Sequence, residues 1–278
     1  MSCPRIGWRE IRTTRTLRTP LSASPIYLGI DVACATGKRL PICFVEPGLP
    51  LTPLTLPRDL RAVLPRGLGN REVTATHPYR DAAQKVAVGL KRIAAESGWR
   101  IERIAVDAPA APPTNGSRSS EVELGRSGLS SFRTPLVSDW PSIREKCAQH
   151  LRSGGGAASL PHANKIWMLF GFELFSALRR ELDVEVIEVY PFAIVRALLP
   201  SCLHKSTEGG FHSQVEAVAQ RTGWEPQGLE TALKSAVPGS RHDRLDAFMS
   251  AWVATLPVEQ RRAFGDAHHP DDSIWVPA

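Results

Sequence analysis

The chain has 278 residues, of which 42% are hydrophobic and 22% are charged. These proportions are close to those of ordinary folded proteins and exclude a disordered or fibrous class, and the length suits one large domain or one domain with an insertion. No apolar run reaches the roughly 18 residues that a membrane helix needs, and no signal-peptide pattern is apparent, so we expect a cytoplasmic protein without membrane contact.

The formal net charge of +6 is unevenly distributed. Residues 1–20 contain five arginines and one glutamate and therefore carry +4 of it. We interpret residues 1–22 as a basic, flexible arm, with a phosphate-binding arm or an organelle transit peptide as alternatives, and residues 23–278 as a single domain. The five cysteines include no Cys-x-x-Cys pair, so neither a disulfide framework nor a thiolate zinc site is expected.

Short apolar runs predict the strands in the first half of the chain. Residues 26–31 and 101–107 are each typical of a strand that is buried on both faces and ends in an aspartate, Asp31 or Asp107. Between them we expect a strand over 40–45 and a possible further strand over 71–76, separated by a proline-rich stretch, 49–70, to which we assign no element. A helix follows over 79–97 and ends at a glycine.

The second half of the chain is mainly helical. Residues 108–160 are too many for an ordinary connection and predict a functional loop or a small insertion with one short helix near 142–151. The remaining elements are a strand over 184–189 and helices over 164–182, 191–199, 211–222, 227–236 and 241–255. This order predicts an α/β fold with a mixed sheet and right-handed crossovers.

Acidic residues at the ends of these elements indicate a site. If the strands that end in Asp31 and Asp107 are parallel neighbours, both carboxylates lie at the edge where open α/β sheets bind ligands. Asp243 and Asp246, three residues apart on the last helix, face the same way. Glu188 lies on an otherwise apolar strand face and needs a partner, because burying an unpaired carboxylate is costly.

Clustered carboxylates favour a hard cation, because they repel one another and raise one another's pKa. Enzymes that hydrolyse phosphodiester bonds commonly use two Mg²⁺ or Mn²⁺ ions about 4 Å apart, of which one activates the attacking water and the other stabilises the leaving oxygen. A simpler interpretation remains open for each aspartate, since a residue after a strand often caps a turn or helix. Asp243 in particular is positioned to cap the last helix.

Five short blocks in sequence order resemble the predicted ribonuclease H-like nuclease family catalogued as domain of unknown function 429. They are YLGIDVA (27–33), IAVDAP (104–109), EVYP (188–191), HDRLDA (242–247) and SIWVP (273–277), and the segments EVEL (121–124), FRTP (132–135) and KST (205–207) are similar to the family as well. The resemblance spans about residues 26–277. It implies a ribonuclease H-like mixed sheet, three antiparallel strands followed by two parallel ones, flanked by helices and enlarged here by the insertion at 108–160.

The last helix is similar to that of RuvC-type Holliday junction resolvases. By that likeness the metal ligands would be Asp31, Asp107, Asp243 and Asp246, with Glu188 as a further acidic candidate and His242 as a proton carrier. The leading hypothesis is therefore a nuclease that uses two Mg²⁺ or Mn²⁺ ions on DNA, RNA, a hybrid or a junction, with a resolvase-like homodimer as a further expectation. The cations expected to contact nucleic-acid phosphates are Arg118, Arg126, Arg133 and Lys205, and a solvated loop is the alternative for the three arginines.

Two other classes remain open. A non-catalytic nucleic-acid or protein-binding module could retain the same fold. An actin-like ATPase or sugar kinase is less favoured, because the turn after the first strand reads Asp31-Val32-Ala33-Cys34 where such proteins have Asp-x-Gly to approach a nucleotide.

Overall fold

The computed structural model describes residues 23–278 except 33–35, 71–76, 130 and 132. The predicted N-terminal arm at 1–22 and the predicted strand over 71–76 therefore lie outside the described residues. None of the helices in the described ranges combines the length and the hydropathy that a bilayer-spanning helix requires.

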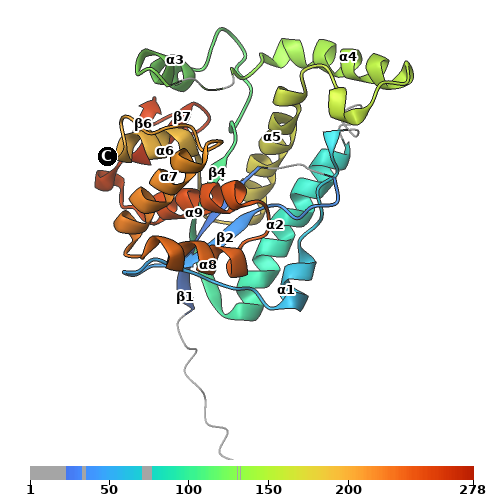
Figure 1. Ribbon diagram of the computed structural model, residues 1–278. Helices are drawn as coiled ribbons and strands as arrows, with labels where there is room; N and C mark the ends of the chain where they lie inside the picture. The colour runs from blue at the N-terminus through green and yellow to red at the C-terminus, as the bar shows by residue number, and fades with distance from the viewer. Residues whose placement is uncertain (1–22, 33–35, 71–76, 130, 132) are drawn as a thin grey trace, which may run out of the picture.

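A seven-stranded mixed sheet in the order β3-β2-β1-β4-β5-β7-β6 forms the centre of the fold (Figure 1). Its strands are β1 (Ser24–Asp31), β2 (Ile42–Glu46), β3 (Thr52–Pro53), β4 (Trp99–Asp107), β5 (Glu185–Val189), β6 (Arg261–Gly265) and β7 (Ser273–Pro277). The first three strands are antiparallel, β4, β5 and β7 run parallel to β1, and β6 pairs antiparallel with β7. The predicted mixed sheet is confirmed, while the third antiparallel strand and the closing β6–β7 hairpin come from segments to which we assigned no strand.

Helices cover both faces of this sheet. They are α1 (Arg58–Val63), α2 (His77–Ser97), α3 (Ser119–Arg126), α4 (Trp140–Arg152), α5 (Ala163–Glu181), α6 (Pro191–Leu198), α7 (Glu208–Thr222), α8 (Pro226–Ala236) and α9 (Arg241–Thr255). The seven helices expected from the sequence correspond to α2 and to α4 through α9, and Gly98, at a φ of 67°, ends α2 as predicted. The helices α1 and α3 were not predicted from the sequence.

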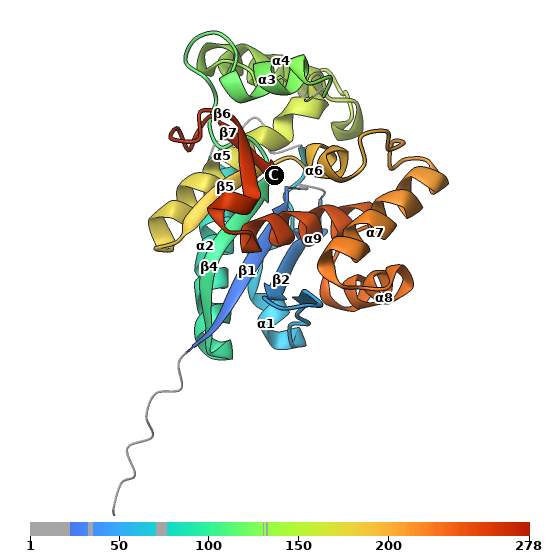
Figure 2. The same cartoon turned by 90° about the vertical axis from the view of Figure 1, so that its left-hand side faces the viewer.

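Alternation along β1 separates two hydrophobic cores. Ile26, Leu28 and Ile30 face α2 and α5, whereas the residues between them face the side covered by α6, α7, α8 and α9 (Figures 1 and 2). Gly29 lies on the second side, and a Cβ placed there would come within 2.0 Å of the Ala247 carbonyl oxygen. The glycine therefore allows α9 to lie directly on β1, which brings the first turns of α9 to the end of that strand.

The predicted insertion at 108–160 is ordered by the C-terminal hairpin. It carries α3 and α4, which both lie at the upper end of the molecule, apart from each other (Figures 1 and 2). The Gly265 backbone N–H donates to Glu123 Oε2 (2.6 Å), and the Asp272 carboxylate accepts from the N–H groups of Ser119 (2.7 Å) and Ser120 (3.0 Å). The β6–β7 hairpin thus supplies the N-terminal cap of α3, a contact between segments that are far apart in the sequence.

Candidate functional site

Asp31 and Asp107 are register partners on the neighbouring parallel strands β1 and β4. Adjacent strands lie about 4.8 Å apart, and register partners project to the same face. Because Ile30 and Val106 face α2 and α5, the two aspartates project to the opposite face, toward α9. The predicted convergence of these two strand ends is confirmed.

Asp246 joins them from α9. Its side chain is buried, with 5% of the residue exposed. Lys205, in the connection between α6 and α7, donates from Nζ to Asp246 Oδ2. The other oxygen, Oδ1, is buried and has no hydrogen-bond partner among the described residues.

The three carboxyl groups make one another difficult to ionise. Burial raises the pKa of Asp31 well above its ordinary value, and repulsion from Asp107, Asp246 and Asp243 raises it further. Burial and then repulsion from Asp246 raise the pKa of Asp107 to about 8. The pKa of Asp246 is also raised, because burial outweighs the attraction of Lys205. A carboxyl cluster of this kind is neutralised either by protons or by a cation.

Lys205 is the nearest cation to this cluster. Burial alone would lower its pKa, but attraction to Asp246, Asp107 and Asp31 outweighs burial, so that the pKa is raised and the ammonium stays charged. We predicted a phosphate contact for Lys205, and in this arrangement its partner is a carboxylate.

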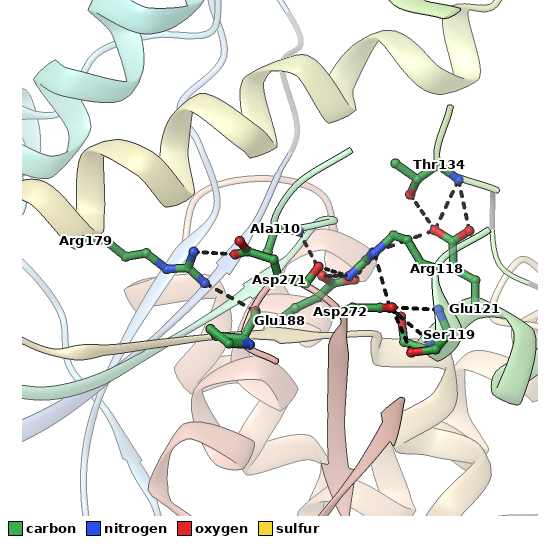
Figure 3. A network of polar contacts seen from close by, with 11 residues as sticks. Ala110, Arg118, Ser119, Glu121, Thr134, Arg179, Glu188, Asp271 and Asp272 are labelled. Carbon is green, nitrogen blue, oxygen red and sulfur yellow. Dashed lines mark hydrogen bonds and ion pairs between the residues drawn. The ribbon is translucent and has the colours of Figure 1, made fainter. Parts of the chain in front are cut away.

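Glu188 lies at the same sheet edge but on the other face. Its register partner is Val106, and its carboxylate accepts from Arg118 Nη1 (2.8 Å), from Arg118 Nη2 and from the Ala110 N–H (2.8 Å) (Figure 3). Arg118 is only 3% exposed and also donates to the Asp271 carbonyl oxygen (3.0 Å). The structure therefore pairs the predicted fifth acid with a predicted phosphate-binding arginine, and it does not bring Glu188 to the face of the three aspartates.

The two remaining candidates on α9 have structural partners. Asp243 forms a capping box, in which the Ser240 N–H donates to its Oδ2 (2.8 Å) and its own N–H donates to Ser240 Oγ (3.3 Å). This is the alternative role that the sequence left open. The His242 ring packs edge-on against Phe211, with centroids 5.0 Å apart. Burial and then Lys205 and Arg241 lower the pKa of His242, so its ring is neutral at pH 7.

The other two predicted cations are exposed. Arg126 lies in the last turn of α3 and Arg133 in the connection that follows it. No ion pair joins either arginine to a described acidic residue. The structure therefore leaves both free to contact solvent or a partner.

A cleft of about 830 Å³ opens beside the two strand-end aspartates. Both aspartates line it together with Glu188, and its other walls include Trp167 of α5 and Tyr190, which follows β5. No pattern in the sequence marks these aromatic residues as part of a site, because only the fold brings α5 to the ends of the strands. The cap that Asp272 gives to α3 was also not predicted, although the Ser119-Ser120 pair is a recognisable helix-start signal.

Asp31, Asp107 and Asp246 suit a hard cation in charge and in donor type. The buried and unpartnered Oδ1 of Asp246 and the mutual repulsion of the carboxylates are what such an ion would relieve. As the described residues are arranged here, no group of three or more His, Cys, Asp or Glu side chains is set to hold an ion. A metal ion would have to displace Lys205 from Asp246.

Comparison with known proteins gives one match. The family model described as protein of unknown function (DUF429) matches residues 71–272, which include Asp107 and Asp246 but not Asp31. Neither the curated proteins nor the solved structures contain a significant match. Because the family model covers more than two thirds of the sequence, the chain belongs to the DUF429 family.

Proposed function

We propose that this protein is a metal-dependent nuclease that hydrolyses phosphodiester bonds of nucleic acid. The observation that carries the proposal is the convergence of Asp31, Asp107 and Asp246, from two strands and a helix, into one partly buried cluster of mutually repelling carboxyl groups. Strongly perturbed carboxyl groups beside a cleft are typical of a functional site.

The fold gives further support. Three antiparallel strands precede parallel strands, and a helix lies across the first strand with its acidic residue at the strand end. This is the arrangement that the ribonuclease H-like resemblance implies, so we propose that fold for the domain. The nucleic-acid partner, the homodimer and the cytoplasmic location remain predictions.

Asp31, Asp107 and Asp246 are the proposed metal ligands. Asp31 is repelled by Asp107 and Asp246, and Asp107 is repelled by Asp246, as expected of three carboxyl groups close enough to share metal ions. Two Mg²⁺ or Mn²⁺ ions bound there would activate a water molecule and stabilise the leaving oxygen.

Other side chains have supporting roles in this proposal. The Lys205 ammonium, once released from Asp246, is able to pair with a phosphate oxygen of the substrate. The neutral His242 ring is able to accept a proton. Asp243 holds the start of α9, and the Arg118–Glu188 pair holds the sheet edge, so we assign neither group to the metal.

The test is cleavage of single-stranded DNA, duplex DNA, RNA, an RNA–DNA hybrid and a four-way junction with Mg²⁺ or Mn²⁺. Asp31→Asn and Asp107→Asn should abolish cleavage and retain substrate binding, whereas the exposed Asp81→Asn on α2 is the matched control and should cleave normally. If the wild-type protein cleaves none of these substrates with either metal, the proposal is wrong.

A non-catalytic binding module is the second candidate, and the Lys205–Asp246 contact favours it. In such a module the ammonium would permanently replace a metal ion. Lys205→Met would then lower the free energy of unfolding, and no Mg²⁺ or Mn²⁺ would bind. The turn that would distinguish an actin-like ATPase includes residues 33–35, outside the described part of the chain.

A further inference from the structure

The cleft beside the aspartates has the size of a small-molecule site. Its volume of about 830 Å³ falls in the range of roughly 300 to 1,000 Å³ that is usual for such pockets. It is closed on one side by the strand ends that carry Asp31 and Asp107 and on the other by the first turns of α5.

The described residues that line the cleft offer little to a long phosphate backbone. Arg118 is the one cation among them, and its guanidinium is bonded to Glu188 and lies 3.7 Å from Glu121 and 3.8 Å from Asp272 (Figure 3). Proteins that bind nucleic-acid strands make about half or more of their hydrogen bonds to phosphate and sugar, largely from available arginines and lysines. Among the described residues, a phosphate in this cleft would be held by the metal-loaded aspartates and by Lys205 once it is released from Asp246.

The rest of the wall is apolar and partly aromatic. Trp167 and Met168 of α5, Val189 and Tyr190 at the end of β5, and Pro109 after β4 all line the cleft. Trp167 Nε1 donates to the Asn164 carbonyl oxygen (2.9 Å), which fixes the ring and satisfies its polar edge. The half-buried Trp167 packs against two hydrophobic clusters and also borders the cleft, so the part of its ring that lines the cleft can stack on a flat ligand.

We infer that the cleft selects a small phosphodiester that carries one nucleoside, which packs on Trp167 while its phosphate lies at Asp31 and Asp107. This inference rests on the proposed phosphodiester hydrolysis and narrows its substrate from a continuous duplex to a nucleoside ester. In the reaction the water oxygen forms a bond to phosphorus and the bond to the leaving oxygen breaks. With a 4-nitrophenyl ester the leaving group departs as phenolate, and the proton of the water passes to solvent.

The test compares two esters with the same reacting group, thymidine 5′-(4-nitrophenyl phosphate) and methyl 4-nitrophenyl phosphate, in the presence of Mg²⁺ or Mn²⁺. Base stacking on an aromatic side chain contributes about 1–3 kcal/mol, so KM should be about 5- to 150-fold lower for the thymidine ester. Trp167→Leu should remove this preference by raising KM for the thymidine ester alone, and Trp167→Phe should restore most of it.

Trp224 provides the matched control. It is also half-buried and donates from Nε1 to a carbonyl oxygen, that of Leu51 (2.7 Å), but it lies outside the cleft. Trp224→Leu should leave the preference intact, and urea unfolding of each variant separates a folding defect from a change in KM.

The outcomes separate this inference from the proposed function. Equal KM values for the two esters, or a duplex oligonucleotide cleaved with a higher kcat/KM than the thymidine ester, would overturn the inference and leave the nuclease proposal standing. If no ester and no nucleic acid is hydrolysed, the nuclease proposal fails. In that case, quenching of tryptophan fluorescence by thymidine 5′-monophosphate tests whether the nucleoside binds on Trp167. Trp167→Phe should reduce the quenching, and unchanged quenching would overturn the inference.

Discussion

Arg118 and Glu188 form a buried bidentate ion pair that links the insertion to the central sheet (Figure 3). Arg118 immediately precedes α3, and Glu188 lies on β5. The Arg118 side chain also lies within 4 Å of carboxylate oxygens of Glu121 and Asp272. One guanidinium therefore links the start of α3, the strand β5 and the turn between β6 and β7.

Breaking this pair should destabilise the protein. We expect Arg118→Met to lower the free energy of unfolding by about 3–5 kcal/mol, because it leaves the Glu188 carboxylate buried without its cation. The double variant Arg118→Met/Glu188→Gln should recover part of this loss. Urea unfolding of the single and double variants measures the coupling, and a stable Glu188→Gln variant that has lost only activity would instead support a catalytic role for Glu188.

Asp107→Asn should stabilise the metal-free protein. The pKa of Asp107 is raised from its ordinary value of 3.8 to about 8. Between these two pH values the carboxyl group is therefore protonated in the folded state and ionised in the unfolded state. The wild-type protein should therefore lose stability as the pH rises from about 4 to 8, and Asp107→Asn should flatten this slope and add on the order of 1 kcal/mol at pH 8. Urea unfolding in EDTA at several pH values tests this. Asp81→Asn is the control, and an unchanged slope in Asp107→Asn contradicts the prediction.

Lys205→Met should tighten metal binding. The ammonium on Asp246 competes with any cation for the same carboxylate, so its removal should lower the Kd for Mg²⁺ or Mn²⁺ roughly three- to tenfold. Titration calorimetry of the wild-type, Lys205→Met and Lys205→Arg proteins measures this without substrate. Weaker binding by Lys205→Met would show that the lysine supports the metal site and does not compete with it.

Asp272 should make a contribution to stability that is lost in acid. Burial alone would raise its pKa, but hydrogen bonds from Ser120 and Ser119 outweigh burial and hold the pKa below the ordinary value of 3.8. Its stabilising effect is thus complete above about pH 4 and disappears as the pH falls through the lower folded-state pKa. We expect Asp272→Ala to lower the free energy of unfolding by about 1–2 kcal/mol at pH 7 and to make no difference well below pH 3. Urea unfolding at both pH values decides this, and an equal loss at both would rule out the carboxylate as the cause.

Gly29→Ala should displace α9 from β1. The added Cβ would come within 2.0 Å of the Ala247 carbonyl oxygen and 2.2 Å of the Ala251 nitrogen, both of them backbone atoms that cannot rotate away. We expect a loss of about 1–3 kcal/mol or more together with weaker metal binding, because Asp246 moves with the helix. Gly209→Ala on α7 is the control, since its Cβ would meet no atom within 4 Å, and it should be neutral or slightly stabilising. Thermal unfolding and metal titration of both variants test the prediction, which fails if Gly29→Ala behaves like the control.

Local patterns determined much of the framework. Runs of apolar residues predicted β1, β2, β4 and β5, and helical periodicity predicted α2 and the five helices from α5 to α9, because each pattern reflects which faces a segment must bury. The same patterns placed Asp31 and Asp107 at strand ends, and their register pairing follows once the two strands lie side by side. β3 with two residues and α1 with six have too few residues for a periodic signal, so they were missed. α3 is as long as α6 but contains only two apolar residues, Val122 and Leu124, and was missed for that reason.

The sequence by itself therefore determined the mixed α/β order, the strand-end aspartates and the acidic start of the last helix. Only the tertiary structure decided which acids stand together. Glu188 borders the same cleft as Asp107, but one residue of register places it on the other strand face, where it pairs with Arg118. The close contact at Gly29 brings Asp246 and its partner Lys205 to the face of Asp107. These partners come from segments about 40 to 220 residues apart, and no spacing along the chain encodes such contacts, since the packing of the folded chain creates them.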